Sequence, residues 1–176
     1  MSLRGLIAIL ALAWLAPVTI AEDIWRDFRM PEADFEVVLP GEPRLATRNS
    51  DPSGVTFRQY ILERTPVTFS VSYLVFPAGT VERASPNKVI DVARDVLVKE
   101  YGANVRGENA LEFTGSAARE VAFDLPASGG EPGGVARLRV YVVGDRQYTL
   151  MVLTSRGFEE NPAIARFLGS FRVLKQ

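Results

Sequence analysis

The chain has 176 residues, with 20 Lys and Arg against 21 Asp and Glu, and it contains no histidine and no cysteine. A formal net charge of −1 offers no basic excess that would favour nucleic-acid binding. The absence of histidine and cysteine excludes Ser-His and Cys-His nucleophiles, ordinary zinc and copper sites, and disulfide bonds.

The N-terminal segment has the pattern of a secretory signal peptide. Arg4 precedes an uninterrupted apolar run at residues 6–15, a proline breaks that run, and small residues lead up to Ala21. The run is shorter than the ~20 residues that span a bilayer, so an uncleaved anchor is the weaker alternative. We therefore expect export to remove residues 1–21, and residues 22–176 to form one domain in the periplasm or outside the cell.

Runs of β-branched and aromatic residues, separated by Gly and Pro turns, predict an antiparallel sheet. An N-terminal arm with Trp25 and Phe28 precedes these runs and is expected to dock its aromatic side chains on the domain. Residues 67–76 begin with alternating apolar and small polar side chains, which indicates a strand with one face on the core. The strands expected before the central hairpin are residues 34–39, 44–49, 55–62, 67–76, one strand or two short ones within 104–113, and 117–125.

Two helices are marked by residues that cap helix ends. The longer helix begins with Ser85 as its N-cap and ends before Gly102, whereas the shorter helix covers residues 162–168. A strand or extended tail at residues 170–174 follows. The apolar stripe of the longer helix is expected to pack on the sheet, and it consists of Val89, Ile90, Ala93, Val96, Leu97 and Tyr101.

The strongest pattern in the chain is a β-hairpin at residues 136–153, where two apolar runs flank Gly144 and Asp145. A two-residue turn at this point sets Tyr141 opposite Tyr148. One face of the hairpin is almost wholly apolar, whereas the other mixes aliphatic and tyrosine side chains with three arginines. Because a freely solvated face would be more polar, we expect both faces to be covered at least in part, with the hairpin at the centre of an α+β domain.

The best candidate for an interaction surface combines basic side chains with a tyrosine. Arg119 lies on one predicted strand, and Arg137 and Arg139 share a face with Tyr141 on another. If these strands are neighbours, three arginines converge beside the tyrosine and offer a site for a carboxylate or phosphate group. The alternative, which we favour, pairs the arginines across the sheet with acidic residues, namely Glu112, Glu120 and Asp124.

No pattern in the sequence predicts a catalytic, cofactor-binding or metal site. The chain lacks an Asp-rich calcium loop, and the glycines at residues 126–134 are not a phosphate loop because no helix begins there. A hydrolase that uses two carboxylates remains formally open. Asp124 is the acid with the most apolar neighbours in the sequence, and we expect its side chain to point into water.

Four short motifs mark strand, turn and helix-end positions along the chain. They are Phe35-x-Val37-x-Leu39-Pro40-Gly41-x-Pro43, Gly115-Ser116-Ala117-Ala118-Arg119-Glu120, Arg139-x-Tyr141-x-x-Gly144-x-x-x-Tyr148 and Phe167-Leu168-x-Ser170-Phe171. Their order resembles that of the PsbP-like proteins, the family of the extrinsic photosystem II subunit PsbP and its exported bacterial relatives. The resemblance covers residues 25–174 and implies an α/β/α sandwich: a mostly antiparallel sheet with helices packed on both faces.

The resemblance implies a non-catalytic role and no ligand. Metal ions have been linked to PsbP through histidine and acidic positions, and this chain has no histidine to supply such a site. We therefore expect an exported, non-catalytic module without a cofactor, which binds a protein partner or assists assembly in the cell envelope. The alternative is a carrier of a small apolar or anionic ligand, held in a pocket between sheet and helix.

Overall fold

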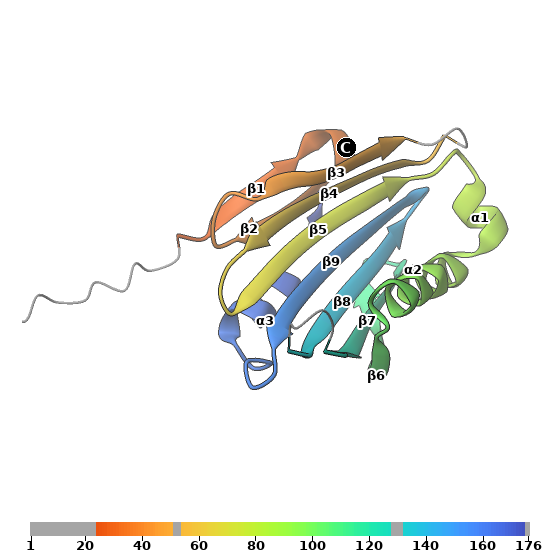
Figure 1. The fold of residues 1–176 in the computed structure, drawn as a ribbon. Helices are drawn as coiled ribbons and strands as arrows, with labels where there is room; N and C mark the ends of the chain where they lie inside the picture. Colours follow the sequence, from red (N-terminus) through yellow and green to blue (C-terminus); the bar gives the residue numbers. More distant parts are fainter. Residues whose placement is uncertain (1–23, 51–53, 128–131, 175–176) are drawn as a thin grey trace, which may run out of the picture.

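The structure, a computed structural model, describes residues 24–50, 54–127 and 132–174 (Figure 1). The predicted signal peptide at residues 1–21 and its cleavage after Ala21 lie outside this part, so export stays a prediction. The described residues form a seven-stranded antiparallel sheet, a three-stranded antiparallel sheet and three α-helices.

Most neighbouring strands in the two sheets follow one another in the chain, apart from the pairs β5–β9 in the large sheet and β2–β10 in the small one. In the large sheet the spatial order is β3 (Arg44–Ser50), β4 (Thr56–Glu63), β5 (Val67–Val75), β9 (Arg146–Ser155), β8 (Gly134–Val143), β7 (Ser116–Leu125) and β6 (Asn104–Phe113). The small sheet consists of β1 (Arg26–Met30), β2 (Phe35–Leu39) and β10 (Arg172–Val173), with a short 3₁₀ helix, η1 (Pro31–Ala33), between its first two strands. The α-helices are α1 (Thr80–Ala84), α2 (Pro86–Tyr101) and α3 (Pro162–Leu168).

The predicted hairpin is the centre of the large sheet. Strands β8 and β9 flank the Gly144-Asp145 turn, and Tyr141 lies opposite Tyr148 as expected. Gly144 has a φ of 57°, a left-handed conformation that glycine adopts without the steric cost of a Cβ atom. Both faces of the hairpin are covered, since Leu138 belongs to a core beneath α2 and Leu150 to a core on the opposite face.

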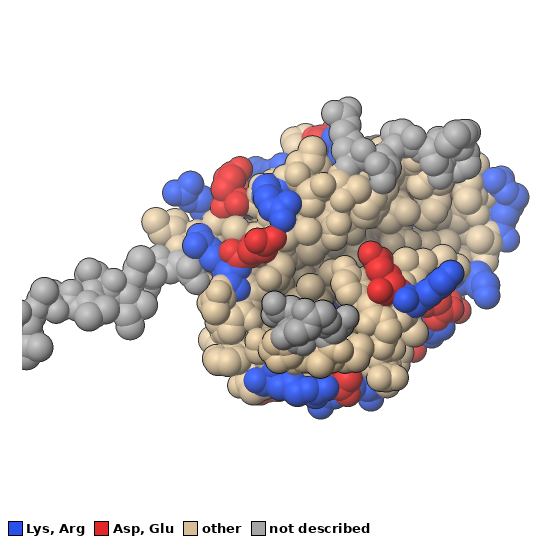
Figure 2. All heavy atoms as spheres, viewed as in Figure 1, with Lys and Arg blue, Asp and Glu red and all other residues tan. Residues whose placement is uncertain are grey.

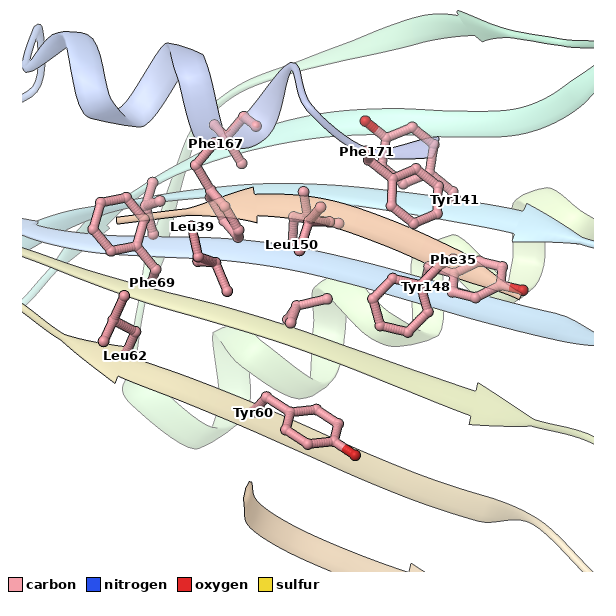
Figure 3. Close-up of a cluster of buried hydrophobic side chains, with 14 of the residues drawn as sticks. Phe35, Leu39, Tyr60, Leu62, Phe69, Tyr141, Tyr148, Leu150, Phe167 and Phe171 are labelled. Carbon is pink, nitrogen blue, oxygen red and sulfur yellow. The ribbon is translucent and has the colours of Figure 1, made fainter. Parts of the chain in front are cut away.

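The core opposite α2 is rich in aromatic side chains, and Figure 3 shows them gathered between the two sheets. Phe35 of β2 meets Tyr148 edge-on, with 5.7 Å between the ring centroids. Phe167 of α3 meets Phe69 of β5 in the same way at 5.3 Å. Contacts of this kind add about 0.5–1.5 kcal/mol beyond the burial of apolar area, so they fix the small sheet and α3 on the large one.

The predicted packing of helices on both faces of the sheet is not confirmed, although the mostly antiparallel α+β class is. Helix α2 packs on one face, whereas the opposite face is covered by the small sheet together with α3. A second sheet forms here because every second residue of β2 is apolar, and these residues, Phe35, Val37 and Leu39, are all buried. Alternate burial is the pattern of a strand, so a second sheet covers this face.

Residues 26–30 and 80–84 form regular elements that the sequence does not indicate. The arm that carries Trp25 and Phe28 includes strand β1, which pairs with β2. Its predicted docking is confirmed, because Trp25 meets Phe69 edge-on at 6.3 Å and Phe28 meets Tyr60 at 5.1 Å. Residues 77–83, where the sequence predicts neither a helix nor a strand, contain most of α1. Residues 104–113 form one strand with an irregularity after Val105.

Helix α2 has the predicted ends but not the predicted buried face. The Ser85 side chain accepts a hydrogen bond from the Lys88 backbone N–H, and Gly102 caps the C-terminus in the left-handed conformation. Ile90 is fully buried, but Val96 is 53% exposed and Tyr101 is 40% exposed. The prediction that Val96 and Tyr101 pack on the sheet is therefore wrong. Helix α2 lies over β7 and β8, so one edge of its apolar stripe projects past the strands that it contacts.

This packing predicts a clear difference between two apolar positions of α2. We expect Ile90→Ala to lower the free energy of unfolding by about 2–5 kcal/mol, because it leaves a cavity in a closed core. Val96→Ala should change the same quantity by no more than about 0.5 kcal/mol, since its side chain is half-exposed. Urea denaturation followed by circular dichroism measures both. Equal destabilisation by the two variants would contradict the observed orientation of α2.

Candidate functional site

A groove of about 590 Å³ lies between α2 and the part of the large sheet that α2 leaves open. The groove exists because the large sheet is wider than the helix that covers it. Strands lie about 4.8 Å apart, so seven of them span about 29 Å, whereas a helix with its side chains is only about 10–12 Å across. Because α2 lies over β7 and β8, it does not reach β4 or β3. Figure 1 shows these strands uncovered on the side where α2 lies.

The wall of this groove, which we call the α2 groove, is apolar. Val92 and Val96 are 52% and 53% exposed, and both line the α2 groove. They lie one turn apart, as residues four positions apart do on a helix, so they form a continuous strip. The wall consists of Val89, Val92, Ala93, Val96 and Leu97.

The floor of the α2 groove mixes small polar and apolar side chains from β4, β5 and β9. The Gln59 side-chain N–H donates to Ser70 Oγ at 3.1 Å, and the Gln147 side-chain N–H donates to Thr149 Oγ1 at 3.2 Å. These polar groups therefore partly satisfy one another without a ligand. The floor comprises Phe57, Gln59, Ser70, Ser72, Leu74, Gln147, Thr149 and Met151.

Charged side chains line the α2 groove only at its ends. Lys88 lies in the first turn of α2 and Glu100 in its last turn, and no other Lys, Arg, Asp or Glu of the described residues lines the groove. Figure 2, drawn from the same side as Figure 1, shows an uncharged area on this face between the charged groups at its left and an acidic and a basic side chain near its middle. The interior of the α2 groove is thus suited to uncharged groups.

The central hairpin turn holds one end of the α2 groove in place. The two carboxylate oxygens of Asp145 accept hydrogen bonds from the backbone N–H groups of Gly79 at 2.7 Å and Val81 at 3.1 Å. These hydrogen bonds keep the pKa of Asp145 below its ordinary value. Because Thr80 and Ala84 of α1 line the groove, Asp145 positions that end through the backbone of α1.

The predicted arginine cluster is divided between the two faces of the sheet. Arg119 is in register with Val140 and lies on the α2 face, whereas Arg139 is in register with Glu120 and lies on the opposite face. Successive residues of a strand point to opposite sides, so Arg119 is separated from Arg137 and Arg139 although β7 and β8 are neighbours. The three arginines therefore do not converge, and the pairing with acidic residues that the sequence favoured is found for Arg137 and Arg139 with Glu120.

Each of these arginines has an acidic partner within the protein. Arg119 lies 2.7 Å from both Asp91 and Glu108. Arg137 and Arg139 lie 2.7 Å and 2.6 Å from the two carboxylate oxygens of Glu120, the one partner anticipated from the sequence.

Tyr141 of the predicted surface and Asp124, one of the acidic partners expected from the sequence, are also engaged elsewhere. Tyr141 is buried and stacks on Phe171, with 4.4 Å between ring centroids, and Asp124 pairs with Arg156 at 2.8 Å. Anion binding by the arginines stays a prediction.

The residues of the α2 groove were not singled out from the sequence, although two signals were present. The small polar residues Ser70 and Ser72 alternate along β5, and that face was expected simply to be solvated. The apolar stripe of α2 is also broader than one helix needs to pack on two strands. Neither signal reveals a groove without knowledge of where α2 lies across the sheet.

Two further observations bear on the kinds of site present. Within the described residues, no group of three or more acidic, histidine or cysteine side chains gathers to hold a metal ion. None of the helices in the same part of the chain combines the length and the apolar character that crossing a bilayer requires.

Comparison with known proteins shows the fold of the chain. No family model matches the sequence, and no curated protein matches it either. The solution structure of the cyanobacterial PsbP protein CyanoP from Synechocystis sp. PCC 6803 is similar, with a TM-score of 0.58 and 16% identity over 92% of this chain and 98% of that chain. The chain therefore has a PsbP-like fold, as its motifs predicted. A crystal structure of PA94, a Pseudomonas aeruginosa protein of unknown function, is more distant, with a TM-score of 0.47 and 12% identity over 80% of this chain and 91% of that chain.

The environment of Glu120 predicts a specific dependence of stability on pH. Burial works to raise the pKa of this carboxyl, but the hydrogen bonds from Arg137 and Arg139 outweigh it, and the net pKa lies below its ordinary value of 4.5. The ionised form is thus favoured in the folded protein, so its contribution is present above pH 4.5 and is lost as the pH falls through the lowered pKa.

We therefore expect Glu120→Gln to lower the free energy of unfolding at neutral pH by about 1–3 kcal/mol, because two half-buried guanidinium groups lose their anion. The deficit relative to the parent should shrink as the pH is lowered to about 3. Urea denaturation across this range measures it, with Glu112→Gln on the exposed side of β6 as the control. A deficit that persists unchanged in acid would show that the carboxylate charge does not stabilise the fold.

Proposed function

We propose that this protein is a non-catalytic, exported binding module that carries a slender apolar ligand in the α2 groove. The observation that carries the proposal is the half-exposed pair Val92 and Val96, which faces an open space above the sheet. Covering such side chains is favourable by about 25 cal/mol per Å² of apolar area, so a ligand along this wall gains affinity from it. The groove volume of about 590 Å³ lies within the range of about 300–1,000 Å³ that is typical of small-molecule sites.

The length and lining of the α2 groove suit a small, elongated apolar ligand. From Lys88 to Tyr101 the helix rises by about 20 Å, at about 1.5 Å per residue. Over that length the described residues of the lining have charged side chains only at Lys88 and Glu100, and the helix wall between them is apolar. These features support the small-ligand alternative raised by the sequence.

The chemistry of the α2 groove supports binding without catalysis. Lys88 and Glu100 lie at opposite ends, so they are too far apart to act on one bond. A hydrolase of the two-carboxylate kind needs a second acid beside Glu100, and no described acidic residue of the lining supplies one. The signal-peptide pattern of residues 1–21 supports a ligand encountered outside the cytoplasm.

The proposal predicts that a charge on the groove wall abolishes binding without unfolding the protein. N-phenyl-1-naphthylamine, an uncharged apolar dye that fluoresces on burial, is the probe. We expect Val96→Asp to weaken its binding at least about tenfold, because a charged carboxylate in an apolar site is costly. Val92→Asp should act in the same way, and both variants should melt close to the parent because the two valines are half-exposed.

A matched control lies on the edge strand β6. Val105 is 45% exposed but does not line the α2 groove, so Val105→Asp should bind the dye like the parent. An equal loss of affinity in Val105→Asp and Val96→Asp, or no dye binding by the parent, would contradict the proposal. Mass spectrometry of a ligand recovered from the protein after prolonged incubation tests the non-catalytic part, since the ligand should be chemically unchanged.

A further inference from the structure

We propose that the α2 groove is a site for a long-chain fatty acid, with the carboxylate beside Lys88 and the alkyl chain directed past Val96 toward Tyr101. This inference rests on the proposed function and names its ligand class. It draws on three features of the α2 groove: its apolar wall, the hydrogen bonds of its floor and the opposite charges at its two ends.

The apolar wall suits an alkyl chain. The strip formed by Val92 and Val96 runs along the helix axis, and Val89, Ala93 and Leu97 complete the wall. An extended alkyl chain laid along the helix therefore contacts apolar side chains.

The floor accepts an apolar chain at a low desolvation cost. Gln59 is hydrogen-bonded to Ser70, and Gln147 is hydrogen-bonded to Thr149. An alkyl chain laid over these residues leaves both hydrogen bonds intact. The side-chain amides of Gln59 and Gln147 therefore keep their hydrogen-bond acceptors when the ligand binds. Met151 and Leu74 lie beside them in the floor and add apolar contact.

The ends of the α2 groove set the direction of the ligand. No ion pair joins Lys88 to another described residue, and its nearest acidic neighbour along the helix face, Asp91, lies 2.7 Å from Arg119. The Lys88 ammonium is therefore available to a ligand carboxylate, and the positive end of the α2 dipole favours an anion at the same place. Glu100 at the far end repels a carboxylate, so the methyl end of the chain lies beside Tyr101.

Competition with the dye separates the parts of this inference. Myristic acid and its methyl ester have the same chain but only the acid is charged. We expect the acid to displace the dye about threefold to tenfold more effectively than the ester, and added salt to reduce that preference. Lys88→Ala should remove the preference without weakening the ester. Lys99→Ala is the matched control, because Lys99 is exposed on the same helix but does not line the groove.

Paramagnetic fatty acids test the direction of the chain. Stearic acid with a nitroxide near its carboxylate should broaden the NMR signals of residues around Lys88, and stearic acid with a nitroxide near its methyl end should broaden those around Tyr101. The reverse pattern, or equal displacement by acid and ester in the parent, overturns the fatty-acid assignment while the α2 groove keeps its binding role. Failure of the dye, acid and ester alike to bind the parent overturns the proposed function itself.

Discussion

The structure depends on one constraint: both faces of a seven-stranded sheet must be covered, and few residues outside the sheet are left to cover them. The hairpin strands β8 and β9 contribute buried apolar side chains to the cores on both faces, whereas β5 does so on the closed face alone, so each face needs a partner. One side receives the small sheet and α3, which together close an aromatic core. The other side receives α2 and the short α1, and a helix about 10–12 Å wide covers only about two strands. Half of that face is left open as a consequence.

This asymmetry assigns different tasks to the two faces. The closed face holds the large buried aromatic residues, such as Phe35 and Tyr148, and their edge-on contacts supply rigidity and stability. The open face has small polar side chains on its floor and a helix wall that is only partly buried. A floor of paired Gln, Ser and Thr residues keeps the uncovered strands compatible with water. The same floor tolerates an apolar ligand, so a site can exist here without a large cost to the folded state.

Electrostatics in this protein mainly organise the fold. Arg119, Arg137 and Arg139 each bind an acidic side chain from a neighbouring element, and Arg119 ties β7 to α2 through Asp91. Asp145 similarly connects the central hairpin turn to α1 through two backbone N–H groups. These contacts fix the helices that border the α2 groove relative to the strands that form its floor. Among the described residues, the groove itself has charged side chains only at its two ends, where the proposed ligand would meet them.

The sequence by itself determined the features that depend on neighbouring residues. Gly144-Asp145 between two apolar runs specified the hairpin and its register, and Ser85 and Gly102 specified the ends of α2, because turns and caps are local in the chain. The motifs also indicated the PsbP-like fold. Only the tertiary structure decided which side of each strand meets which layer. The sequence left open whether Arg119 lies beside Arg139, and the register of β7 and β8 puts the two side chains on opposite faces of the sheet. Val96 belongs to the apolar stripe of α2 by its spacing, yet it lines a groove because the helix lies over β7 and β8. The position of a helix across a sheet depends on the packing of many side chains that are distant in the sequence, so it cannot be predicted from any local sequence pattern.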